Sequence, residues 1–175
     1  MKLLRQFSVY FLLMIILSAC GFHLRGLGNE SKPLPFHTVY IESEGALQES
    51  LNIVFGRDNR VKLSENAALA DAVLKVNGEN IQKDILVINR GGNVNEYLLV
   101  LSTQAVLLKK GVQYPPLTIT VRRTYSYSDN QILGKQNEEQ VIMTDMRNEA
   151  AEQILRRLSY LTPLPENSTS EPSVK

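Results

Sequence analysis

Apolar and polar residues follow several distinct periods along this chain, and each period predicts an element. Residues 38–42 alternate between polar and apolar, which is typical of a half-buried strand. Apolar side chains recur at helical spacing over 47–55, so we expect a helix there that ends near Gly56. A brief extended piece at 61–63 follows, and then a strand over 72–76 that can continue toward 81.

The second half of the chain contains two more strand patterns and the clearest helical repeat. Residues 97–109 are apolar on both faces, so this strand should be covered on both sides. A turn is predicted before it by the sequence R-G-G-N at 90–93, and residues 117–127 alternate as a fourth strand. Apolar residues then repeat every four positions from 142 to 158, which predicts a helix capped by Asn137.

The order strand, helix, three strands and helix predicts an α+β fold. In this fold two helices pack on one face of a mainly four-stranded sheet, as a two-layer sandwich, and the opposite face meets solvent or a partner. We expect a single domain over 37–162, preceded by a tether at 20–36 that is rich in glycine and proline. Residues 163–175 are rich in Pro, Ser, Glu and Thr and should be a disordered tail.

The first nineteen residues are predicted to be a signal peptide and not part of the fold. They have a basic start with Lys2 and Arg5, an apolar run at 9–17, and the sequence L-S-A-C that ends at Cys20. This pattern resembles the lipobox of bacterial lipoproteins, in which the cysteine sulfur takes a diacylglycerol and the new N-terminus is acylated. Two or more acyl chains anchor a protein firmly, and Gly21 in place of Asp favours delivery to the outer membrane.

Composition and charge exclude several classes of protein. The chain has 175 residues, 43% hydrophobic and 21% charged, with a net charge of +1, which are ordinary values for a single globular domain. Removal of the signal peptide leaves 17 basic and 18 acidic residues. No nucleic-acid partner is expected, because no net positive charge is available to bind phosphates. Attraction to an anionic partner has to come from a local group of basic residues.

Residues for catalysis or for a metal site are scarce. The chain has one cysteine, which lipidation would occupy, and two histidines, His23 and His37, without ligands at metal-binding spacing. None of the common nucleotide-binding or nucleophile motifs is present. We therefore expect no catalytic residue, no metal and no cofactor.

Four basic residues are candidates for binding an anionic ligand. Arg90 projects from the glycine-rich turn, and Lys135 follows Gly134 in the loop expected before the last helix, whose N-terminus favours anions. Arg122 and Arg123 on the fourth strand can belong to the same surface. From spacing alone, ordinary solvent-exposed charge is the simpler interpretation of all four residues.

Three separated segments resemble one family, the LptE lipoproteins of lipopolysaccharide assembly. Residues 20–25 read C-G-F-H-L-R, residues 89–92 read N-R-G-G ahead of a long strand, and residues 134–140 read G-K-Q-N-E-E-Q ahead of the final helix. The resemblance implies a lipid-anchored outer-membrane protein that sits inside the LptD β-barrel, one copy per barrel, and helps that barrel to assemble. It also implies that lipopolysaccharide binds at the positions of Arg90 and Lys135.

Two other functions remain possible on the sequence alone. The protein could be a free-standing lipoprotein that faces the periplasm and binds another anionic amphiphile without a barrel. A lipoprotein hydrolase is a third alternative, and the lack of a nucleophile and base argues against it. An obligate barrel partner distinguishes the first two functions.

Overall fold

The computed structural model describes residues 32–127 and 132–161, and for residues 132–136 it describes the backbone only. Cys20 and the expected tail at 163–175 lie outside the described residues. The elements, in chain order, are β1 (Thr38–Glu42), α2 (Ala46–Gly56), β2 (Lys62–Leu63), the 3-10 helix η1 (Ala67–Leu69), β3 (Ala72–Val76), β4 (Asn80–Ile88), β5 (Val94–Lys109), β6 (Val112–Gln113), β7 (Leu117–Ser126) and α3 (Ile132–Leu158).

The sheet is organised around β5, its longest strand. One edge of β5 pairs with β4 along its first half and with β3 along its second half, and the other edge pairs with β7 and β6. The short strands β1 and β2 extend the sheet beyond β3 in parallel. The prediction of an α+β fold is confirmed, but the prediction of a four-stranded sheet is wrong because the described residues form seven strands.

β3 and β4 are consecutive strands along the same edge of β5. Between them, the Asn77 amide donates to the Gln104 carbonyl at 2.9 Å and the Thr103 hydroxyl donates to the Asn77 carbonyl at 2.8 Å. These two hydrogen bonds hold the connection between β3 and β4 against the edge of β5. Because β1 lies beside β3 and not beside β4, the outer edge of β4 pairs with no other described strand.

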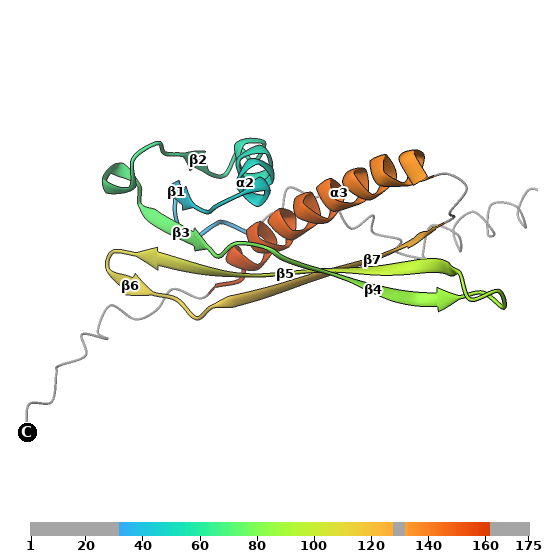
Figure 1. Cartoon of the computed structure of the whole chain (residues 1–175). Helices are drawn as coiled ribbons and strands as arrows, with labels where there is room; N and C mark the ends of the chain where they lie inside the picture. The colour runs from blue at the N-terminus through green and yellow to red at the C-terminus, as the bar shows by residue number, and fades with distance from the viewer. Residues whose placement is uncertain (1–31, 128–131, 162–175) are drawn as a thin grey trace, which may run out of the picture. The chain divides into compact units, whose positions relative to one another are not determined.

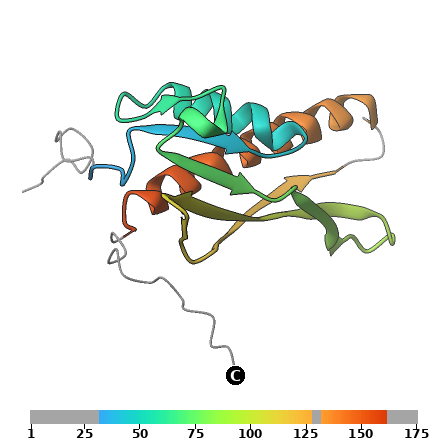
Figure 2. The ribbon, with the colours of Figure 1, turned by 90° about the vertical axis from the view of Figure 1, so that its left-hand side faces the viewer.

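Both helices lie on the same side of the sheet (Figures 1 and 2). The odd-numbered residues of β5 from 99 to 107 point to this side and are buried, as strand periodicity requires. α3 runs antiparallel to β7, while α2 lies near β1, β2 and α3. Neither helix covers the end of β4, residues 85–88, so the expected two-layer sandwich is only an approximate description.

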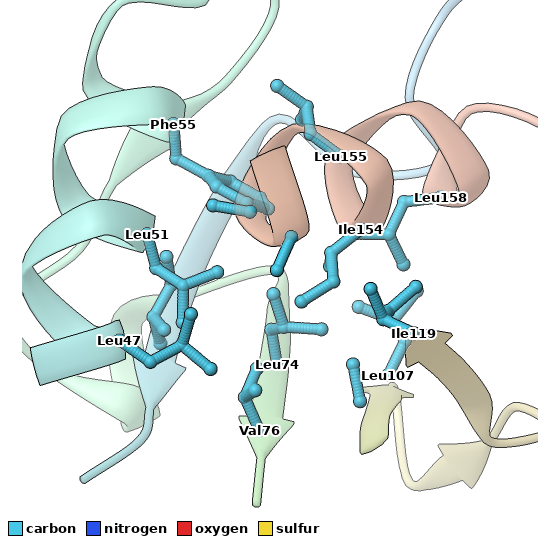
Figure 3. Packing of buried hydrophobic residues seen from close by; sticks show 14 of the residues in the cluster. Leu47, Leu51, Phe55, Leu74, Val76, Leu107, Ile119, Ile154, Leu155 and Leu158 are labelled. Carbon is cyan, nitrogen blue, oxygen red and sulfur yellow. The ribbon is translucent and has the colours of Figure 1, made fainter. Parts of the chain in front are cut away.

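The hydrophobic core lies between the two helices and the sheet (Figure 3). Leu47, Leu51 and Phe55 of α2 are fully buried at the helical spacing that the sequence predicts. They are joined by buried residues of α3 and of the sheet: Leu74, Leu107, Ile119, Met146, Ala150, Ile154 and Leu158. Leu34 and Phe36, which belong to the expected tether, are also buried, so the packing starts before residue 37.

α3 begins earlier than the sequence predicts. The expected cap, Asn137, lies inside a helix that starts at Ile132, so the predicted start is wrong. The intervening glycine, Gly134, lowers helix stability by about 1 kcal/mol relative to alanine but does not by itself end a helix. Lys135 is therefore in the first turns of α3 and not in a loop before it.

Candidate functional site

Arg90 lies at the tip of the β4–β5 hairpin, in a turn that Asn89 organises. The Asn89 side-chain oxygen accepts hydrogen bonds from the backbone amides of Gly91, at 2.9 Å, and Asn93, at 3.0 Å. Gly92 has a φ of 85°, a left-handed conformation that glycine adopts without strain. We refer to residues 89–93 as the hairpin turn. It holds Arg90 on an exposed turn that is closed by these hydrogen bonds.

The Arg90 side chain is exposed and makes no hydrogen bond or ion pair with the described residues. An arginine that is free of internal partners can place its planar guanidinium against a phosphate or carboxylate in a bidentate contact. The hairpin turn thus presents a cation that is available for an external anion.

A cluster of polar and aromatic side chains joins the hairpin to α3. Glu139 of α3 accepts hydrogen bonds from Lys83 of β4 at 2.6 Å and from the Tyr125 hydroxyl of β7 at 2.5 Å. The Lys83 ammonium also lies 4.4 Å from the ring centre of Tyr97, within cation–π range. Tyr97 stacks on Tyr125, with ring centres 5.6 Å apart, and meets Tyr127 edge to face. We call these five residues the Glu139 cluster.

The cluster stabilises the charged forms of its acid and base. Burial opposes the negative charge of Glu139, but the interactions with Lys83 and Tyr125 outweigh burial and lower the pKa of Glu139. Burial likewise opposes the charge on Lys83, and contacts with Glu139 and Tyr125 outweigh it and raise the pKa of Lys83. Burial, together with the neighbouring Glu139, raises the pKa of Tyr125. The ion pair is therefore formed at neutral pH.

This cluster also fixes where the start of α3 lies relative to the hairpin. Lys135 is four residues before Glu139, about 6 Å along the helix axis. Arg90 is seven residues after Lys83, roughly 23 Å along an extended strand. β4 and β7 are both antiparallel to β5, so they run in the same direction, and α3 runs opposite to them. A step back along α3 and a step forward along β4 therefore lead to the same end of the sheet. The hairpin turn thus reaches past the first turns of α3 (Figure 1).

The sequence alone does not establish that Arg90 and Lys135 share one end of the molecule. Their backbones do lie at this common end, but Arg90 projects beyond Lys135 by roughly 15–20 Å on these helix and strand rises. The Lys135 side chain lies outside the described residues. If both cations bind one ligand, that ligand has to be an extended one.

Arg122 and Arg123 do not share a surface. They are opposite Val100 and Leu99 of β5, respectively, and therefore point to opposite faces of the sheet. Arg123 faces α3, where it donates a hydrogen bond to Glu149 and forms an ion pair with it. Arg122 is exposed on the face that no described helix covers. A ligand-binding role for these two residues stays a prediction.

The Glu139 cluster and the exposed part of β4 are the features that sequence reasoning missed. The sequence pattern gives Glu139 no partner and predicts no strand around Lys83. The run I-L-V-I at residues 85–88, directly before the hairpin turn, was the available signal for a strand.

The described residues contain neither a metal site nor a membrane-spanning helix. No group of three or more His, Cys, Asp or Glu residues is arranged to hold a metal ion in this part of the chain. No helix within 32–127 and 132–161 is long and apolar enough to cross a membrane. Cys20, the predicted lipidation site, lies outside the described residues.

Comparison with known proteins gives one consistent family. The family model described as "LptE: Lipopolysaccharide-assembly" matches residues 36–158. A protein named LPS-assembly lipoprotein LptE from Pectobacterium atrosepticum is 31% identical over 155 residues, which cover 84% of this chain and 80% of the relative. One of the same name from Yersinia pestis is 31% identical over 151 residues, covering 84% of this chain and 72% of the relative.

Solved structures show the same arrangement of elements. The solution structure of lipoprotein B from Nitrosomonas europaea superposes with a TM-score of 0.64 at 31% identity and covers 79% of this chain and 90% of that one. The crystal structure of rare lipoprotein B from Shewanella oneidensis gives a TM-score of 0.62 at 24% identity, covering 71% of this chain and 95% of that one. The second likeness is evidence for the fold only.

Proposed function

This chain belongs to the LptE family of lipopolysaccharide-assembly lipoproteins, and we propose that it binds lipopolysaccharide at the hairpin turn and the start of α3 while docked in the LptD β-barrel. Membership gives the broader function directly: the protein is a non-enzymatic envelope lipoprotein that acts in lipopolysaccharide assembly. Ligand binding, the barrel and the outer-membrane location are the proposed parts.

The observation that carries the ligand proposal is the unpaired Arg90 on the ordered hairpin turn. Lipopolysaccharide is anchored by a phosphorylated glycolipid, and charge-assisted hydrogen bonds from arginine and lysine suit its phosphates. The family resemblance ties the same two positions, Arg90 and Lys135, to this ligand. A guanidinium held on a turn of fixed shape can bind without a large loss of backbone freedom.

The uncovered face of the sheet supports docking inside a barrel. On this face of β5 two half-buried apolar pairs, Leu98 with Val100 and Val106 with Leu108, are separated by the polar residues Ser102 and Gln104. Thr118, Thr120 and Thr124 of β7 stand beside these residues, together with Arg122, so the face is of mixed polarity with polar residues at its centre. The interior of a plugged barrel is polar, and a face of mixed polarity can be accommodated there.

We further propose that Cys20 carries the lipid anchor and that the protein resides at the outer membrane. A diacylglycerol thioether and an acylated N-terminus would together supply more than the two acyl chains needed for stable attachment. Gly21 after the cysteine favours this location. The domain would then lie between the periplasm and the barrel lumen.

Reversing the charge of the two proposed contacts tests the ligand site. Arg90→Glu and Lys135→Glu should each weaken lipopolysaccharide binding by about 10–100-fold, because each loses a charge-assisted hydrogen bond and adds a repulsive charge. Binding of the full-length protein to labelled lipopolysaccharide would be measured, together with a thermal unfolding curve for each variant.

Arg57→Glu is the matched control, because Arg57 is an exposed arginine after α2 and outside the proposed site. Its binding should stay at the wild-type level. Wild-type binding by Arg90→Glu and Lys135→Glu, with native unfolding curves, would remove both residues from the ligand site. The free-standing lipoprotein for another amphiphile would be favoured if the wild-type chain itself bound no lipopolysaccharide.

A further inference from the structure

Four consecutive aliphatic side chains are exposed at the end of β4, next to the hairpin turn. Ile85, Leu86, Val87 and Ile88 keep 55%, 48%, 40% and 58% of their surface accessible. The other large exposed apolar residues in the described part of the chain are spread over α2, β2, η1, α3 and the turn after α3, as is ordinary for a protein surface. A continuous exposed run of this kind is a candidate interaction surface. We call residues 85–88 the aliphatic strand end.

The position of these residues explains why they remain exposed. β4 pairs with β5 on one edge only, and a register shift between Ile85 and Val87 turns the strand at this point. α2 and α3 leave this end of β4 uncovered, and the hairpin reaches beyond both helices (Figure 1). The aliphatic strand end therefore offers side chains on both faces of a projecting strand.

Basic residues lie on both sides of the aliphatic strand end. Arg90 follows Ile88 by two residues and is unpaired within the described chain, and the start of α3, with Lys135, lies level with the strand end itself. Lys83, on the other side, is held by Glu139. Two acids lie nearby, Asp84 on the strand and Glu96 opposite Val87, so the cation at the tip is the available group for a negatively charged ligand.

We propose that the aliphatic strand end binds the acyl chains of the lipopolysaccharide molecule whose phosphates Arg90 and Lys135 contact. This inference rests on the proposed function and adds a second, apolar half to the same site. An anionic glycolipid complements this surface in both respects, since its phosphates match the cations and its chains match the exposed aliphatic side chains.

The chemistry of the strand edge distinguishes this ligand from a purely apolar one. The outer edge of β4 has backbone N–H and C=O groups without a partner strand, and such groups need hydrogen bonds when water is displaced. Sugar hydroxyls of a glycolipid can supply these bonds while its flexible chains lie over the side chains. The bulge between Ile85 and Val87 works against a second strand pairing there, because bulges are a common way in which proteins protect open edges.

Comparing two forms of one ligand tests this proposal. The probes are intact lipopolysaccharide and the same lipopolysaccharide from which the acyl chains have been removed by alkaline treatment with the phosphates retained. The full chain would carry Cys20→Ala, so that it has no acyl groups of its own. It should bind the intact form at least about 10-fold more tightly than the deacylated form, because only the intact form buries apolar surface.

The double variant Ile85→Asn/Ile88→Asn should lose this preference and bind the deacylated form as the parent does. Both side chains are more than half exposed, so the fold should be preserved. Leu69→Asn is the matched control, because Leu69 is 78% exposed in η1, away from the hairpin. It should keep the parent's preference. Arg90→Glu should weaken binding of both forms by the same factor.

Each other result contradicts the proposal in a distinct way. Equal binding of both forms by the parent would leave the ionic site standing and remove the acyl-chain contact. A preference that persists in Ile85→Asn/Ile88→Asn would place the chains elsewhere. A parent that is dimeric by light scattering and becomes monomeric in the double variant would make a second copy the occupant. Binding of neither form would overturn the proposed function itself.

Discussion

At the scale of single residues, Glu139 connects the candidate site to the rest of the fold. It accepts hydrogen bonds from Lys83, 56 positions earlier in the chain, and from Tyr125 on a different strand. Sequence patterns could not reveal this contact, because it depends on the register of β4, a strand that the pattern did not predict. Asn89 is different: its role in the hairpin turn follows from the local sequence N-R-G-G-N.

Glu139→Gln should destabilise the protein in a pH-dependent way. The pKa of Glu139 is lower in the folded protein than its ordinary value of 4.5. Its contribution to the free energy of unfolding is therefore full above about pH 4.5 and is lost as the pH falls through the lowered pKa. At pH 7 the variant should lose about 1–2 kcal/mol, because Gln keeps neutral hydrogen bonds in place of the stronger charge-assisted ones.

Urea unfolding at pH 7 and at several lower pH values measures this difference. Glu152→Gln, on the exposed side of the same helix, is the control and should leave the unfolding free energy unchanged within about 0.5 kcal/mol at each pH. A wild-type to Glu139→Gln difference that stays constant from pH 7 to pH 3 would show that the ion pair does not stabilise the fold.

At the scale of elements, burial decides which parts of the fold could be predicted. β1, α2, β5 and β7 were predicted close to their observed bounds, because each buries one regular set of side chains. β4 was missed because most of its residues are exposed on both faces, so nothing requires its apolar and polar residues to alternate. The predicted start of α3 was wrong because the capping pattern at Asn137 lies inside a helix that begins at Ile132.

Leu51→Ala tests the predicted packing of α2. Leu51 is fully buried among the residues of both helices and the sheet, so its truncation should reduce the free energy of unfolding by about 2–5 kcal/mol. Leu69→Ala removes the same atoms from an exposed site and should change it by less than about 0.5 kcal/mol. Chemical unfolding followed by circular dichroism would compare the two. Equal losses would mean that α2 does not pack as described.

At the scale of the whole molecule, the helices cover one face of the sheet and leave the other face and the hairpin without a partner in the described chain. The half-buried apolar pairs on β5 and the aliphatic strand end are separate features, the former on the open face and the latter at the projecting tip. The net charge of +1 gives no overall attraction to anions, so recognition of a phosphorylated ligand has to be local. This division fits a lipoprotein that has a barrel on one surface and a ligand at another.

Purification of the full-length lipidated protein from detergent-solubilised outer membranes, with mass spectrometry of the bound proteins, tests this account most directly. We predict that a large β-barrel protein of lipopolysaccharide assembly is recovered in a one-to-one ratio with the chain. Recovery of the lipoprotein as a monomer without a barrel would contradict the account and favour a free-standing binding protein.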